Sequence, residues 1–144
     1  MAESELHRRL KDDASRELQK DGYSVFYEPL FPPLPGVGWV AYRPDLFGQR
    51  ESSDGEEFVI VECETRPSMR KLLAKNSRRI WMQTHISHSD RLRRILVIPP
   101  RSLGKIDPSA RKRWEIWIVA EEIFRIPRVG GGEEDGEPDL RRGR

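Results

Sequence analysis

Phe58-Val-Ile-Val-Glu62-Cys63-Glu64 is an apolar run that ends in two carboxylates around the chain's only cysteine. Four consecutive apolar residues are typical of a strand buried on both faces of a sheet, and we expect this strand over residues 57–64. Successive side chains of a strand point to opposite faces, so Glu62 and Glu64 are predicted to share one face and Cys63 the other. Two carboxylates at the end of a core strand are costly to bury without a partner. We therefore expect a metal ion, a basic partner or solvent beside them.

A third carboxylate, that of Asp45, lies upstream in an Arg-Pro-Asp-Leu motif at the predicted end of a strand over residues 39–47. If the two strands are neighbours, directly opposed Cβ atoms of Asp45 and Glu62 would lie about 5 Å apart. Two carboxylates at that spacing can share a hard divalent cation such as Mg²⁺, and the backbone carbonyl of Cys63 could add a ligand. The sequence therefore predicts a site for Mg²⁺ or Mn²⁺ formed by Asp45, Glu62 and the Cys63 carbonyl.

Structural interpretations of the same acids stay open. Asp45 can cap the turn that follows it. Glu62 and Glu64 can pair with Arg66 and Arg43 in an ion network that has no role in catalysis. Density for a metal ion between Asp45 and Glu62 would decide between these interpretations and a cation site.

The rest of the chain predicts a single α/β domain. The apolar periodicity of residues 3–20 predicts a helix, and its apolar arc includes His7, which we expect at a contact between helix and sheet. Cys63 is expected in the core. The other expected elements are strands at 23–28, 39–47, 57–64, 94–99 and 114–120, a helix from 67, a short helix at 108–113 and a brief segment to 126. We expect the first three strands to form an antiparallel meander and the last two to pair in parallel, in a mixed β-sheet flanked by helices.

Composition limits the class of protein further. The 144 residues fit one domain, which we place at 1–129, followed by a disordered charged tail at 130–144. There is no apolar run near the ~20 residues that span a bilayer and no secretory signal, so no membrane partner is expected. A single cysteine fits a reducing cytoplasm, and scarce Asn and Cys fit either a thermophilic source or a biased genome.

Charge is concentrated directly after the acidic pair, although the net charge of the chain is only +2. Between Arg66 and Arg94 the sequence contains nine basic residues and one acidic residue, Asp90. Such a segment suits a polyanion, so nucleic acid, in the first place DNA, is the expected partner. The residues expected to contact it are Arg66, Arg70, Lys71, Arg78 and Arg79. An ordinary solvated helix face explains the same charges equally well.

The Pro-Asp motif, the strand that ends in Glu-x-Glu and the order of elements (αβββαβαβ) together resemble the PD-(D/E)xK nuclease superfamily. The resemblance covers roughly residues 3–120 and includes archaeal Holliday-junction resolvases and competence-protein-like members. It implies the restriction-endonuclease-like fold, with Asp45 as the metal-binding aspartate, Glu62 as the second acid and Glu64 at the usual lysine position. Many such nucleases act as dimers, so a homodimer is also implied.

The resemblance departs from the family at Glu64, because family members usually place a lysine there. Glutamate cannot supply positive charge, but it could accept a proton from the attacking water or help a second ion. A lysine moved onto the following helix, Lys75 or Lys71, could restore the charge. The family's additional helical acid would fall on Glu17, and Glu28 is a further candidate acid.

Three functions follow from these observations. The first is a metal-dependent DNA endonuclease that uses Asp45, Glu62, Glu64 and Lys75. The second is a catalytically inactive nucleic-acid-binding module on the same fold. The third is an interaction domain whose basic helix binds an acidic protein.

Overall fold

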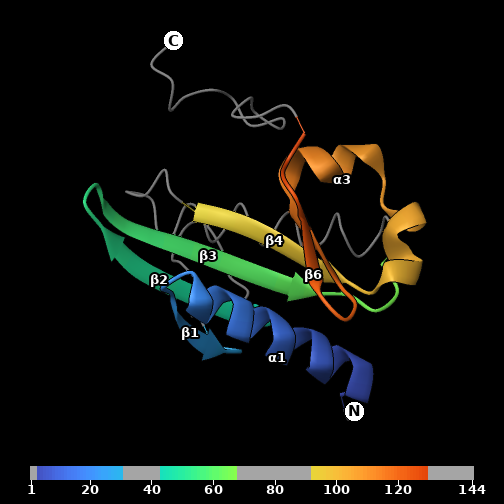
Figure 1. The fold of residues 1–144 in the computed structure, drawn as a ribbon, viewed down its shortest axis with the longest axis horizontal. Coiled ribbons are helices and arrows are strands. Elements are labelled where there is room, and N and C mark those ends of the chain that lie inside the picture. Colours follow the sequence, from blue (N-terminus) through green and yellow to red (C-terminus); the bar gives the residue numbers. More distant parts are fainter. Residues whose placement is uncertain (1–2, 31–42, 68–91, 130–144) are drawn as a thin grey trace, which may run out of the picture.

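A six-stranded mixed sheet forms the centre of the structure, a computed structural model that describes residues 3–30, 43–67 and 92–129 (Figure 1). The helical elements are α1 (Glu5–Lys20), the 3-10 helix η1 (Pro100–Lys105) and α3 (Pro108–Arg113). The strands are β1 (Ser24–Tyr27), β2 (Leu46–Ser52), β3 (Gly55–Cys63), β4 (Leu92–Ile98), β5 (Glu115–Val119) and β6 (Ile123–Ile126). The predicted helix from residue 67 onward and the predicted tail at 130–144 lie outside the described residues.

The order of strands across the sheet is the same as their order in the chain, β1 to β6. β1, β2 and β3 pair antiparallel, whereas β3 with β4 and β4 with β5 pair in parallel. The predicted meander and the predicted parallel pairing are therefore confirmed. β6 then returns antiparallel beside β5, so the brief segment expected before residue 126 forms an edge strand.

The second strand lies further along the chain than predicted. Of the strand expected at 39–47, residues 39–42 lie outside the described residues and residues 43–45 are not in a strand. β2 begins at Leu46 and continues through Gln49 and Arg50 to Ser52, and only two residues separate it from β3. The polar side chains are accommodated across the hairpin. Arg50 is paired in register with Glu57, forms an ion pair with it, and its guanidinium lies 4.4 Å from the centre of the Tyr23 ring. Partnered polar residues fit a half-buried strand as well as apolar ones do.

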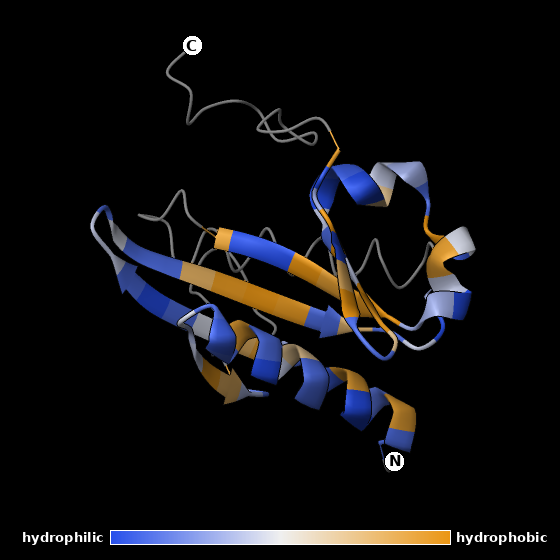
Figure 2. Cartoon of the chain, viewed as in Figure 1, coloured by the Kyte–Doolittle hydropathy of each residue, from blue (hydrophilic) through white to orange (hydrophobic). Residues whose placement is uncertain are grey.

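Each face of the sheet has its own apolar core. α1 covers one face, and its residues Leu10, Ala14 and Leu18 are completely buried in a cluster with β3 and β4. The other face has a second cluster, in which Trp114 and the α3 residue Ala110 pack against β4 and β5. Figure 2 shows the hydrophobic middle of β3 beside the hydrophobic second half of β4, while the hairpin end of β2 and β3 is hydrophilic. Alternate residues of the central strands therefore serve the two cores, as period-two alternation requires.

Within residues 3–30, 43–67 and 92–129, no helix is both long enough and apolar enough to cross a membrane.

Candidate metal and nucleic-acid site

A polar cavity of about 450 Å³ lies at the end of β3, between the first turn of α1 and the start of β2. Its floor is the end of β3, one wall is the helix, and the other wall comes from the segments that follow β1 and precede β2. The cavity brings together acids that are far apart in the sequence. The lining residues are Glu3, Ser4, His7, Glu28, Arg43, Asp45, Cys63, Glu64 and Thr65.

Two hydrogen bonds hold Asp45 beside the end of β3, one through its side chain and one through its backbone. Its carboxylate oxygen Oδ2 accepts the backbone N–H of Cys63 at 2.7 Å, and its backbone carbonyl accepts the N–H of Glu28 at 3.0 Å. Leu46 is paired with Val61 in the β2–β3 register, so Asp45 lies level with the end of β3. Asp45 is thus beside the end of β3 as predicted, but it precedes its strand instead of ending one.

His7 reaches into the cavity from α1 and contacts two of the three predicted oxygen ligands, Asp45 and the Cys63 carbonyl. Its Nε2 lies 3.1 Å from the Cys63 carbonyl oxygen and 3.5 Å from Asp45 Oδ2, while Nδ1 lies 2.6 Å from Glu3 Oε2. Both ring nitrogens face acceptors, so the ring satisfies them only when it carries both protons. The predicted contact of His7 with the sheet is confirmed. The sequence did not indicate that His7 would lie among the candidate metal ligands.

The pKa of His7 is raised from its ordinary value of 6.5 to about 9. The hydrogen bond to Asp45 is the largest cause; burial opposes it and lowers the pKa, and the hydrogen bond to Glu3 raises it further. An imidazolium at neutral pH therefore stands between two groups that were predicted to bind a cation.

This pKa makes the stability of the fold depend on pH. A pKa that is higher in the folded state adds stability that is complete below about pH 6.5 and is lost as pH rises through about 9. We expect the free energy of unfolding to fall by about 2 kcal/mol between pH 6.5 and 9.5, relative to His7→Gln, which has no group that titrates there. Urea unfolding of both proteins across this range measures the difference. Parallel curves for the two proteins would contradict the expected ion pairs.

A buried lysine organises the acids at the rear of the cavity. Lys11 is only 3% exposed, lies 2.6 Å from Glu3 Oε2, and forms an ion pair with Glu28. Burial lowers the pKa of Lys11, but the hydrogen bonds to Glu28 and Glu3 outweigh burial and raise it above its ordinary value. Glu28, a predicted candidate acid, has φ of +48°, a left-handed conformation that non-glycine residues adopt rarely. The structure thus places Glu28 in the cavity. Lys11 was not among the residues predicted for the site.

The two glutamates on either side of Cys63, at the end of β3, have different environments. Glu64 lines the cavity, and its backbone N–H donates to the Val97 carbonyl at 2.9 Å. Glu62 is 3% exposed, does not line the cavity, and alternates with Val61 and Cys63, which face α1. Glu62 therefore belongs to the opposite face of the sheet. The predicted core position of the Cys63 side chain is confirmed, because that side chain is buried in the cluster under α1.

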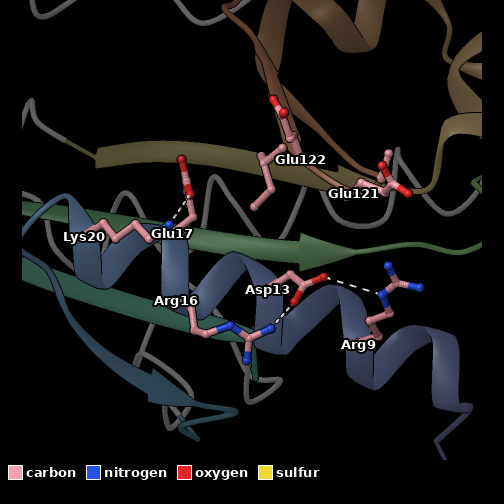
Figure 3. Close-up of a pocket in the computed structure, with 9 residues that line it drawn as sticks. Arg9, Asp13, Arg16, Glu17, Lys20, Glu121 and Glu122 are labelled. Atoms are coloured by element: carbon pink, nitrogen blue, oxygen red, sulfur yellow. Dashed lines mark hydrogen bonds and ion pairs between the residues drawn. The ribbon is translucent and has the colours of Figure 1, made fainter.

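Glu17, the helical acid that the family resemblance implied, lies elsewhere. Its carboxylate pairs with Arg125 of β6 at 2.7 Å and lines a groove between α1 and the β5–β6 turn. Figure 3 shows this groove, with Glu17 beside Lys20 on the helix and Glu122 across from it. The family resemblance, which implied Glu17, did not indicate how far along the helix the cavity lies. Glu17 is therefore not brought to Asp45.

Several predicted site residues cannot be placed against this cavity. Lys75 and the predicted nucleic-acid contacts Arg70, Lys71, Arg78 and Arg79 lie outside the described residues. Arg66 is described, and it is exposed three residues after β3 ends. The positive charge that the described residues show at the cavity comes from His7 and Arg43 on its lining and from Lys11 behind it.

The donor atoms fit a hard cation with few protein ligands. The Asp45 carboxylate and the Cys63 carbonyl already converge on one charged nitrogen, and both are oxygen donors of the kind that Mg²⁺ and Mn²⁺ prefer. Among the residues that the structure describes, no group of three or more His, Cys, Asp and Glu side chains is placed to hold a metal ion. A cation here would therefore need water or substrate oxygens to complete its shell.

The comparisons with known proteins identify the fold. No family model matches the chain, and no curated protein matches its sequence. Two solved structures do match, each over 85% of this chain and 99% of its own, with a TM-score of 0.51. They are an fdxN element excision controlling factor protein from Anabaena variabilis, 14% identical, and an XisH family protein from Nostoc punctiforme, 16% identical. The shared architecture is the restriction-endonuclease-like fold, as the sequence predicted.

Proposed function

We propose that this protein is a metal-dependent nuclease that hydrolyses phosphodiester bonds in DNA, with its centre at Asp45 and the end of β3. The observation that carries the proposal is the convergence of Asp45 Oδ2 and the Cys63 carbonyl on one cationic nitrogen. This convergence occurs at a strand end of a restriction-endonuclease-like sheet. Because fold alone does not determine function, the local arrangement of the donors is the stronger support.

In this proposal Asp45 and the Cys63 carbonyl hold an Mg²⁺ or Mn²⁺ ion, whereas Glu62, which was predicted as a second acid, lies on the opposite face of the sheet and is not a ligand. The ion would neutralise phosphate charge and make a bound water more acidic. Glu64 lines the same cavity and can accept a proton from the attacking water. Arg43 on the lining can hold a phosphate oxygen, and Arg66 can contact the nucleic-acid backbone further out.

The basic segment after β3 supports a polyanionic substrate. The span from Arg66 to Arg94 contains nine basic residues and one acidic residue, and such a segment would attract a phosphate backbone. The Anabaena neighbour is named as a factor that controls excision of an element. By analogy, we include a role in the control of excision in the proposal.

A cleavage assay tests the proposal. The protein is incubated with supercoiled, single-stranded and branched DNA in the presence of Mg²⁺, Mn²⁺ or a chelator. We expect cleavage that requires the ion and falls by about 100-fold or more in Glu64→Gln, since this substitution removes the proton acceptor but keeps the shape. Glu121→Gln is the matched control, because Glu121 is an exposed acid of the other groove. If no substrate is cut with either ion, the proposal fails.

The glutamate at position 64 favours a second function, a nucleic-acid-binding module without catalysis. In this alternative the absent lysine marks lost chemistry, and the basic segment alone contacts the phosphates. DNA binding would then weaken steeply with salt but would not change with divalent ions or with Glu64→Gln. Ion-dependent cleavage in the assay above would exclude it.

A further inference from the structure

The His7 ring stands where a cation bridging Asp45 and Cys63 would have to stand. Nε2 is 3.1 Å from the Cys63 carbonyl oxygen and 3.5 Å from Asp45 Oδ2, so both oxygens face the same atom. Mg²⁺ binds oxygen at about 2.0–2.1 Å. An ion that bridges these two oxygens therefore needs the volume that the ring now fills.

The ring is held in that position from behind. Its Nδ1 lies 2.6 Å from Glu3 Oε2, and the same oxygen lies 2.6 Å from Lys11 Nζ. The backbone N–H of His7 donates to Ser4 Oγ at 3.0 Å, which is the N-cap hydrogen bond of α1. Lys11 in turn is paired with Glu28 on the opposite wall of the cavity. The first two turns of the helix and the cavity wall thus fix the ring by a continuous series of ion pairs.

The two oxygens that the His7 ring contacts are those of the proposed metal site. One belongs to Asp45, which also caps the Cys63 N–H, and the other is the last carbonyl of β3. Both residues line the cavity. Glu64, the next residue, lines the same cavity.

We propose that His7 is an intramolecular plug that competes with the divalent cation for Asp45 and the Cys63 carbonyl. This inference rests on the proposed function, because it describes how cation binding at that site is regulated. The plug occupies the site without an ion, since Nε2 contacts both the Cys63 carbonyl oxygen and Asp45 Oδ2. A bound cation displaces the ring from the sheet and frees the Glu3 side chain from its contact with Nδ1.

Binding of Mn²⁺ alone, without nucleic acid, tests the plug. Free Mn²⁺ is followed by its electron paramagnetic resonance signal in titrations of the full chain at pH 7. We expect His7→Ala to bind Mn²⁺ about tenfold more tightly than the wild type, because the competing charge-assisted hydrogen bonds are gone. Arg8→Ala is the control: it removes a positive charge from an exposed neighbouring position that does not line the cavity, and we expect its affinity to stay within about twofold of the wild type.

Asp45→Asn in the same titration separates the failure of the plug from the failure of the proposed metal site. If the wild type binds Mn²⁺, Asp45→Asn loses binding, and His7→Ala binds equally or more weakly, then His7 is no competitor and the plug is overturned while the metal site stands. If neither the wild type nor His7→Ala binds Mn²⁺, the metal site itself is refuted. Circular dichroism of His7→Ala, with helix content equal to the wild type, shows that a change in affinity does not come from loss of α1.

Discussion

Asp45→Asn is expected to lower the metal-dependent cleavage of DNA by about 10²–10³-fold while leaving the fold intact. In the proposed nuclease, Asp45 is the carboxylate that holds the cation. The ion would stabilise the charge of the transition state by several kcal/mol. Each 1.36 kcal/mol of that stabilisation corresponds to a tenfold change in rate. Asparagine keeps an oxygen at the same place. That oxygen can still accept the Cys63 N–H, for which the carboxylate now lies at 2.7 Å. The substitution therefore removes the charge and keeps the cap.

Asp45→Ala is the matched variant that removes both. The Cys63 N–H then loses its acceptor in a partly buried position, and we expect a loss of about 1–3 kcal/mol in the free energy of unfolding. Asp45→Asn keeps this acceptor but loses the ion pair with His7, so its loss should be less than about 1 kcal/mol above pH 9.5, where His7 is mostly neutral, and larger at pH 6.5. Urea unfolding and the cleavage assay are run on all three proteins. Wild-type cleavage by Asp45→Asn would mean that Asp45 serves only as a strand cap.

The central part of the fold was predictable because its signals are local. The run that ends at Cys63 has the composition of a strand buried on both faces, and period-two alternation placed the Cys63 side chain on the α1 side. The meander and the parallel strands followed from the lengths of the connections. β2 was misplaced because Arg50 and its polar neighbours look like a turn when taken alone. Their partners, such as Glu57, become visible only when the hairpin is formed.

The site was predictable in part for a similar reason. Asp45 and the Cys63 carbonyl were identified from residues at predicted strand ends, and antiparallel pairing brings those ends together. The contact of His7 with Cys63 joins residues 56 positions apart and depends on where along the sheet α1 packs. Periodicity gives the face of a helix but not its position along its axis, so His7 and Glu17 looked equivalent. Lys11 was missed because a lysine in an amphipathic helix normally lies in solvent.

Trp117→Ala is expected to cost about 3–5 kcal/mol in the free energy of unfolding, the largest change in stability that we predict. Trp117 is completely buried in the cluster that joins α1 to the sheet. Its indole N–H donates to Glu115 at 2.7 Å, and the Arg125 guanidinium lies 4.5 Å from the ring centre. Since small domains are stable by about 5–15 kcal/mol, this loss would leave little margin. Phe124→Ala, in the neighbouring strand, is the control, because Phe124 is 55% exposed and its removal should change stability by less than about 1 kcal/mol.

Trp117→Ala also tests whether the contacts of His7 in the cavity depend on the packing of α1 against the sheet. His7 reaches Cys63 only while α1 is packed on the sheet, and Trp117 lies in the cluster beneath that helix. At a temperature where Trp117→Ala is still folded, we expect the pKa of His7, followed by NMR, to fall from about 9 toward its ordinary 6.5. In Phe124→Ala it should stay near 9. An unchanged pKa in Trp117→Ala, together with the expected loss of stability, would mean that the ion pairs of His7 alone hold the first turns of α1 against the sheet.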